Sequence, residues 1–194
     1  CEKVLDIVMV NLLFVVSCLP ILTIGVAKIS LYQTIFEVKR SRRIPVFKIY
    51  IRAFKQNLKL GFQLGLLELG IFLISVVDLS LFWSQTGVAF QLIKAICLGI
   101  LIFLTLVMLA SYPIAARYEL TWKEVLQKGL LLVSFNFVWF FLMLAIILLI
   151  IMLLYLSGFT LVLGGSAFLL FGFGLLAFCQ AGLMEKLFAK YQAD

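Results

Sequence analysis

Five long apolar runs dominate this sequence and constrain its fold more than any other feature. They extend over residues 5–27, 60–83, 88–112, 129–156 and 160–184. Each is long enough to cross a bilayer, because a spanning helix needs about 20 apolar residues. Apolar side chains make up 65% of the 194 residues, which excludes a water-soluble globule. The sequence therefore predicts an all-α, polytopic membrane protein with five transmembrane helices, in a single transmembrane domain over residues 1–194.

The distribution of basic residues predicts how the chain is oriented. Nine of the 16 Lys and Arg residues, including Lys28, Arg42 and Arg43, lie between the first and second runs. Three more lie between the third and fourth runs and two after the fifth, whereas the connections near 84–87 and 157–159 contain none. Because cytoplasmic loops carry the excess of basic residues, we expect the N-terminus outside the cell and the C-terminus in the cytoplasm.

The first basic loop contains an amphipathic segment over residues 46–59, which we expect to be helical and cytoplasmic. Its apolar side chains recur at helical spacing: Phe47, Ile51, Phe54 and Leu58. A parallel basic stripe follows one position later: Lys48, Arg52, Lys55 and Lys59. This pattern is typical of a helix lying in the membrane interface against anionic lipids. A solvated loop and a surface for a partner protein remain alternatives, and the position of the cations argues against nucleic acid.

The composition excludes several kinds of chemistry. The chain has no histidine, which removes the usual general base and the commonest metal ligand. Its cysteines are far apart and have no metal-binding spacing: Cys1, Cys18, Cys97 and Cys179. No phosphate-binding glycine loop and no serine-nucleophile motif is present in the sequence. We therefore expect no catalytic residues, no cofactor and no metal.

Ionisable residues within the apolar runs are the best functional candidates, because a charge in a membrane is costly. Asp78 and Lys94 lie at similar distances from the turn that joins the second and third runs. We expect these two side chains to form an ion pair across that hairpin, in which each compensates the other's loss of hydration.

Glu68 is the third such residue and has no cation at its predicted depth. It shares a helical face with Gly61 and Gly65, whose small-xxx-small spacing allows close helix packing. The other runs place polar or helix-breaking residues near the same depth: Pro20, Thr105, Asn136 and Gln180. This layer is interpreted as interhelical hydrogen bonding with Glu68 protonated. A cation or proton site, and a carboxylate offered to another subunit, are the functional alternatives.

Local signals predict three features of the helices. Thr121 and Glu124 form a T-x-x-E capping box, which begins a helix in the second cytoplasmic loop. Pro113 is expected to break or kink the third spanning helix at its inner end. In the first run, Pro20 and Gly25 are expected to kink or end the helix, with the Thr23 hydroxyl bonding the freed carbonyls.

Three strings carry a resemblance to a known family. They are LPILTIGVA at 19–27 with Leu31 and Tyr32 behind it, FKQNL at 54–58, and YPIAARY at 112–118. In these strings and in its five spans the chain resembles the YesL family, the bacterial group known as domain of unknown function 624. The family-motif residues at the helix break are Pro20, Thr23 and Gly25.

The resemblance implies a context rather than a mechanism. Members are small proteins of the cell membrane in Gram-positive bacteria that accompany carbohydrate ABC importers. The chain lacks the permease-type EAA loop, so we do not expect the pore-forming subunit. One hypothesis is a non-enzymatic accessory subunit that forms a hetero-complex with the permease subunits. The other is a homo-oligomeric transporter or channel that uses the polar layer around Glu68.

Overall fold

The computed structural model describes residues 2–41, 45–83 and 87–192, which are helical and contain no β-strand. Its elements in chain order are α1 (Glu2–Ser17), η1 (Ile21–Thr23), α2 (Ile24–Arg40), α3 (Val46–Gln56), α4 (Leu58–Phe82), α5 (Val88–Arg117), α6 (Trp122–Phe135), α7 (Phe137–Leu154), α8 (Gly158–Ala167), η2 (Phe168–Gly172) and α9 (Phe173–Gln192). The element η1 is a short 3-10 helix and η2 is a π-helical turn. Arg42 and Arg43 of the basic loop lie outside the described residues.

Five segments are long and apolar enough to cross a membrane. They are Ile21–Arg40, Leu58–Leu81, Val88–Arg117, Phe137–Leu154 and Gly164–Ala189. The predicted all-α class is therefore confirmed for the described residues, together with the number of helices able to span. The protein is a multi-pass membrane protein.

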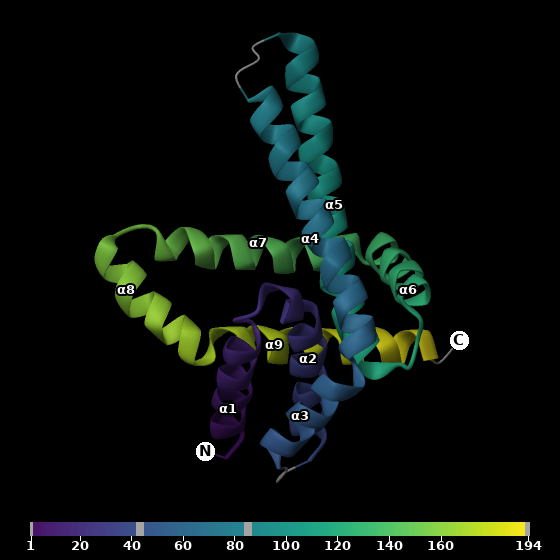
Figure 1. The fold of residues 1–194 in the computed structure, drawn as a ribbon, viewed down its shortest axis with the longest axis vertical. Helices are drawn as coiled ribbons and strands as arrows, with labels where there is room; N and C mark the ends of the chain where they lie inside the picture. Colours follow the sequence, from purple (N-terminus) through teal and green to yellow (C-terminus); the bar gives the residue numbers. More distant parts are fainter. Residues whose placement is uncertain (1, 42–44, 84–86, 193–194) are drawn as a thin grey trace.

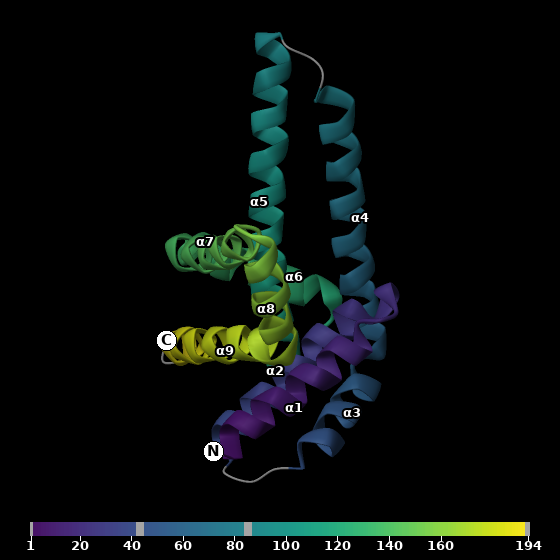
Figure 2. The same cartoon turned by 90° about the vertical axis from the view of Figure 1, so that its left-hand side faces the viewer.

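The first predicted span, residues 5–27, is not one continuous helix. α1 ends at Ser17 and α2 begins at Ile24, and the two helices pack side by side in opposite directions (Figures 1 and 2). Pro20 has no N–H and a fixed φ, so α1 does not continue through it. The Thr23 hydroxyl lies 2.7 Å from the Ser17 carbonyl oxygen and 2.8 Å from that of Pro20. The prediction of one span is wrong because the break becomes a hairpin, which brings the N-terminus to the end of the molecule where α2 meets α3.

α2 forms the core of the fold. It contacts α1, α3, α4, α5 and α9. In the segment Ile21–Arg40, which contains α2, 61% of the most apolar stretch is buried, compared with 33% or less in the other four candidate spans. Ala27, Ile29 and Ile35 have no exposed surface at all. Because α2 is surrounded by other helices, its side chains can contact several of them.

The long helices do not form an up-and-down bundle. α4 and α5 pack against each other as an antiparallel hairpin that projects beyond the other helices (Figures 1 and 2). α7 runs crosswise to α5 and contacts it (Figures 1 and 2), and only 6% of the Phe137–Leu154 segment is buried within the chain. Much of the apolar surface of α7 is therefore left for lipid or another protein to cover.

The fourth predicted span, residues 129–156, is interrupted. α6 ends at Phe135 and α7 begins at Phe137, because the backbone of Asn136 leaves the helical region at φ −127° and ψ 34°. The Asn136 side-chain amide donates to the Leu132 carbonyl oxygen at 3.1 Å, which satisfies one group at the end of α6. The prediction of one continuous helix over this range is therefore wrong.

The fifth predicted span, residues 160–184, contains the π-helical turn η2, and a distant side chain stabilises it. Asn11 of α1 is fully buried and donates to the Leu169 carbonyl oxygen at 2.6 Å. The Asn11 side-chain oxygen Oδ1 accepts a hydrogen bond from the Gly174 N–H at 2.7 Å. Asn11 therefore bonds one backbone group within the irregular turn and one just after it, and holds α1 against the turn.

The predicted capping box at the start of α6 is confirmed. The backbone N–H and the hydroxyl of Thr121 both donate to Glu124 Oε2 at 2.8 Å. These hydrogen bonds favour the carboxylate, so they hold the pKa of Glu124 below its usual value. α6 therefore begins with satisfied backbone groups after the second basic loop.

Candidate functional site

The site begins where α2 and α4 cross in close contact. A side-chain carbon at Gly25 would lie 2.8 Å from Gly65 Cα, and one at Gly61 would lie 2.5 Å from Val26 Cα. Only residues without a side chain allow two helix backbones to approach this closely. The glycines therefore bring the next turns of α2 and α4 together.

One turn beyond the crossing, a lysine and a glutamate form an ion pair. Lys28 Nζ on α2 lies 2.6 Å from Oε1 and 2.8 Å from Oε2 of Glu68 on α4. The Tyr112 hydroxyl on α5 donates to Glu68 Oε2 at 2.5 Å. Lys28 Nζ also lies 4.7 Å from the centre of the Tyr112 ring, within the range of a cation–π contact. Three helices are thus joined through one carboxylate.

This geometry corrects the prediction for Glu68, which was expected to have no cation at its depth. The sequence placed Lys28 in a loop because the first apolar run seemed to end at residue 27. α2 instead continues from Ile24 to Arg40, so Lys28 lies inside a buried helix and faces α4. The negative charge of Glu68 is therefore balanced within the chain.

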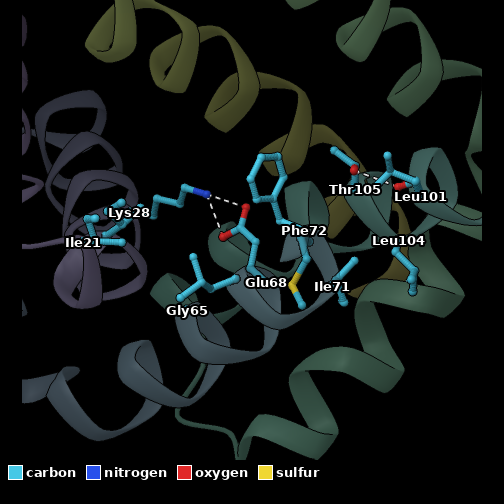
Figure 3. Close-up of a pocket in the computed structure, with 12 residues that line it drawn as sticks. Ile21, Lys28, Gly65, Glu68, Ile71, Phe72, Leu101, Leu104 and Thr105 are labelled. Carbon is cyan, nitrogen blue, oxygen red and sulfur yellow. Dashed lines mark hydrogen bonds and ion pairs between the residues drawn. The ribbon is translucent and has the colours of Figure 1, made fainter. Parts of the chain in front are cut away.

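The ion pair lines a cavity of about 350 Å³ between the start of α2 and the middle of α4 and α5. Figure 3 shows Lys28 reaching across the cavity to Glu68, with the Phe72 ring beside the carboxylate. The other lining residues are almost all apolar: Ile21, Ile24, Gly65, Leu69, Ile71, Leu101, Leu104, Thr105 and Met108. The site is thus a charge-neutral polar pair with apolar walls.

A second polar contact lies beside the first and joins α9 to it. The Tyr32 hydroxyl on α2 donates to Gln180 Oε1 at 2.5 Å. Gln180 Nε2 donates in turn to the Leu109 carbonyl oxygen at 2.7 Å. That carbonyl would normally accept the N–H of residue 113, which is a proline and has none. The Gln180 side chain therefore replaces the missing backbone hydrogen bond.

A break or a kink was predicted at Pro113, and this replacement explains why α5 is not broken there. The helix runs through Pro113 and ends at Arg117. Pro113 is buried and its freed carbonyl partner is satisfied from α9, so the helix continues for another turn.

Replacing Gln180 with leucine should destabilise the fold. The substitution leaves two buried polar groups without their partner, the Leu109 carbonyl oxygen and the Tyr32 hydroxyl. Each unsatisfied buried group costs about 1–3 kcal/mol, and relaxation towards other partners keeps the expected total loss at about 2 kcal/mol. Reversible unfolding in mild detergent, followed by circular dichroism, measures this loss.

A proline substitution provides the matched control. Pro113→Ala restores an N–H that can bond Leu109 O, so Gln180→Leu should cost less in that background than in the unmodified chain. An equal loss in both backgrounds would show that Gln180 does not compensate for Pro113.

The predicted ion pair between Asp78 and Lys94 is not formed. The ion pairs among described residues are Lys28–Glu68 and Lys39–Glu185. Lys94 Nζ donates instead to the Trp83 carbonyl oxygen at 3.0 Å. Carbonyl groups at a helix C-terminus have no partner within the helix, and Trp83 follows the last residue of α4. The prediction is wrong because this nearby backbone group attracts the lysine.

The predicted polar layer is only partly assembled. Thr105 lines the same cavity as Glu68 but donates to the Leu101 carbonyl oxygen of its own helix at 2.8 Å. Gln180 joins the neighbouring contact, and the Asn136 side chain donates to the Leu132 carbonyl oxygen at the end of α6. Pro20 lies at the α1–α2 turn. The residues that complete the site, Lys28, Tyr32 and Tyr112, were missed as partners of Glu68 and Gln180.

The remaining candidates lie elsewhere in the fold. The basic stripe of Lys48, Arg52, Lys55 and Lys59 is on the exposed side of α3 and the first turn of α4. Within the part of the chain that the structure describes, no group of three or more Cys, Asp and Glu side chains is arranged to hold a metal ion.

Residues 7–79 match the family model described as "Protein of unknown function, DUF624". The match includes the LPILTIGVA and FKQNL strings and both members of the Lys28–Glu68 pair. It confirms the resemblance over this part of the chain, whereas the YPIAARY string lies beyond it. No curated protein and no solved structure matches the chain.

Proposed function

We propose, on the premise that residues 7–79 of this multi-pass membrane protein form a DUF624 region, that the protein is a non-enzymatic accessory subunit. In this proposal it binds the membrane-embedded permease subunits of a bacterial carbohydrate ABC importer. The resemblance to the YesL family suggests the importer as the partner complex. The exposed α1–α2 turn suggests that a protein partner is needed.

The α1–α2 turn exposes its apolar side chains halfway along the α4–α5 hairpin. Ile21 lines the same cavity as Phe72, near the middle of α4, and Leu101, near the middle of α5. Leu19 is 79% exposed and Leu22 is 52% exposed. If α4 and α5 cross the bilayer, this irregular turn lies at membrane depth.

Irregular backbone exposed to lipid does not occur within the hydrocarbon region, because its polar groups have no water to bond. Such a turn is stable there only when protein covers it or a water-filled cavity borders it. The α1–α2 turn faces outward with an apolar surface of Leu19, Ile21 and Leu22. A hydrophobic partner subunit is the cover that fits this surface best.

The internal ion pair also favours an accessory role over ion transport. A transport site built on Glu68 would need its carboxylate to be available to a cation or proton. Lys28 and Tyr112 already occupy both carboxylate oxygens. The self-associating transporter or channel is therefore the weaker proposal, and it is an outcome of the experiment below.

The α1–α2 hairpin favours an orientation different from the one that the sequence predicts for the N-terminus. Asp6 of α1 and Lys48 of α3 line one hollow, so α1 begins beside the basic loop. Lys39 of α2 and Glu185 of α9 form an ion pair at 2.9 Å, which brings the end of α9 to the same region. We propose that the protein lies in the bacterial cell membrane with both termini on the cytoplasmic side.

Site-specific crosslinking in the native host tests the accessory role. Leu22 in the full chain is replaced by the photoreactive residue p-benzoyl-phenylalanine, and the cells are irradiated before the membranes are solubilised. We expect an adduct whose second component is an ABC permease subunit, identified by mass spectrometry. The matched control places the same residue at Leu92, an equally apolar and 61% exposed position far from the turn, and should yield much less of this adduct.

Two outcomes would overturn the proposal. Adducts of Leu22 only with a second copy of the chain would support the self-associating transporter instead. A turn that forms no protein adduct, while the chain is present and folded in the membrane, would show that no subunit covers it.

A further inference from the structure

α3 has an inner face that belongs to the protein core and an outer face that does not. Val46, Tyr50 and Ala53 are 3%, 0% and 1% exposed, and they pack where α3 meets α1 and α2. Phe47 and Ile51 are 53% and 36% exposed on the outer side. The sequence grouped the apolar side chains of α3 into one lipid-facing stripe. The structure adds an apolar face that anchors α3 to the fold.

The outer face is strongly basic. Lys48, Arg52 and Lys55 of α3 are exposed, and Lys59 follows on the first turn of α4. The sequence of α3, VFKIYIRAFKQ, contains no acidic residue. The two ion pairs between described residues use other lysines, Lys28 and Lys39. Asp6 lines a hollow together with Lys48, but the pair is not among these ion pairs. The positive charge is therefore not balanced by an ion pair within the described chain.

The position of α3 is fixed relative to a membrane-spanning helix. Only Asn57 separates it from α4, and the Asn57 side-chain amide donates to Gln33 Oε1 and to the Ala53 carbonyl oxygen, both at 2.8 Å. α3 lies at the end of the molecule opposite the projecting tip of the α4–α5 hairpin (Figures 1 and 2). If α4 crosses the bilayer, the amphipathic helix α3 at its end lies at the level of the lipid headgroups.

We propose that the outer face of α3 binds anionic phospholipids, with the phosphate groups held by Lys48, Arg52 and Lys55. Phe47 and Ile51 lie among the upper parts of the acyl chains. The alternation of exposed apolar and cationic side chains favours a lipid surface over an acidic protein, because a lipid offers an anionic group and hydrocarbon at adjacent depths. This inference does not depend on the accessory role proposed above.

Lipid binding to the purified full chain in a mild nonionic detergent tests this proposal. Short-chain phosphatidylglycerol is titrated against the wild-type chain and the variant Lys48→Gln/Arg52→Gln/Lys55→Gln, and bound lipid is counted by native mass spectrometry. Each cation near an anionic lipid surface contributes about fivefold to binding. We expect the triple variant to bind phosphatidylglycerol at least tenfold more weakly, while short-chain phosphatidylcholine binds both proteins equally and weakly.

Two further variants define what is measured. Lys123→Gln/Lys128→Gln/Lys186→Gln removes three exposed cations elsewhere and should retain wild-type binding. Phe47→Gln keeps every charge but removes the exposed ring, and should weaken phosphatidylglycerol binding severalfold. Circular dichroism of each variant confirms that it is folded before binding is compared.

The proposal is overturned if the α3 triple variant binds phosphatidylglycerol as tightly as the wild-type chain, or if phosphatidylcholine binds as well as phosphatidylglycerol. It is also overturned if inorganic phosphate at equal concentration displaces the lipid completely, because the acyl chains would then contribute nothing. Binding of polyglutamate to the α3 cations without any binding of phosphatidylglycerol would point to an acidic protein instead.

Discussion

Lys28→Met is expected to destabilise the folded chain by about 2–3 kcal/mol, because removing one member of the ion pair leaves the charge of Glu68 without its partner. The loss is smaller than for a fully buried pair, since the two side chains are 28% and 34% exposed. Glu68 would keep the hydrogen bond from Tyr112 but lose the cation that lies 2.6 Å from its carboxylate. The other residues that line the cavity are uncharged, so none of them can replace the lysine. Unfolding of the purified chain in detergent, followed by circular dichroism, measures the loss.

The variant Lys28→Met/Glu68→Met/Tyr112→Phe separates this effect from a simple loss of packing. It replaces the polar groups by apolar side chains of similar size, and such replacements of a whole buried cluster are often close to neutral. We therefore expect it to recover most of the stability lost in Lys28→Met. Lys59→Met, on the exposed first turn of α4, is the control for lysine removal and should change stability by less than about 0.5 kcal/mol. If Lys28→Met is as stable as the wild-type chain, the ion pair does not contribute to the fold.

The sequence predicts well those features that depend on neighbouring residues. The hydropathy of the apolar runs identifies segments able to span a membrane, because each residue in a helix contributes its own transfer free energy. The capping box of Thr121 and Glu124 is equally local, since both of its hydrogen bonds lie within one helical turn. Pro20 signals a break, and Thr23 satisfies the carbonyls there as expected.

What the helix break does to the fold is not local. The mean hydropathy stays high on both sides of Pro20, which suggests one helix that crosses the membrane. The chain instead turns back at Pro20, and α2 lies in the core. This reversal moves Lys28 from an expected loop to a position facing Glu68. The sequence therefore identified Glu68 as a candidate but did not identify Lys28 as its partner. The signal that could have suggested a position inside the fold is that Lys28 follows the break at Pro20 and Gly25 by only one helical turn.

The other missed contacts join residues that are far apart in the chain. Gln180 bonds Leu109 O, and Asn11 bonds Gly174 N across most of the chain. In each case a side-chain amide satisfies backbone groups of an irregular or proline-containing helix. From sequence alone Pro113 predicts a break or a kink, because no neighbouring residue can replace the lost hydrogen bond. The fold supplies that replacement from α9.

Gly25→Ala is expected to separate α2 from α4 and to destabilise the chain by about 3 kcal/mol, at the upper end of the cost of overpacking. The added methyl group would lie against the Gly61 carbonyl oxygen and 2.8 Å from Gly65 Cα. Both neighbours are backbone atoms, so no side chain can rotate away to make room. Moving the helices apart would also lengthen the contact between Lys28 and Glu68 one turn away, so the substitution affects the crossing and the ion pair together.

Gly70→Ala on α4 is the matched control, because a methyl group there meets no atom within 4 Å. Alanine is the better helix former, so this variant should equal or exceed wild-type stability by about 0.5–1 kcal/mol. The two glycine substitutions thus have opposite expected signs although their chemistry is identical. Disulfide crosslinking between cysteines introduced on α2 and α4 gives a second measurement, and Gly25→Ala should slow it. A Gly25→Ala chain as stable as Gly70→Ala would mean that the α2–α4 crossing is looser than the backbone contacts at Gly61 and Gly65 require.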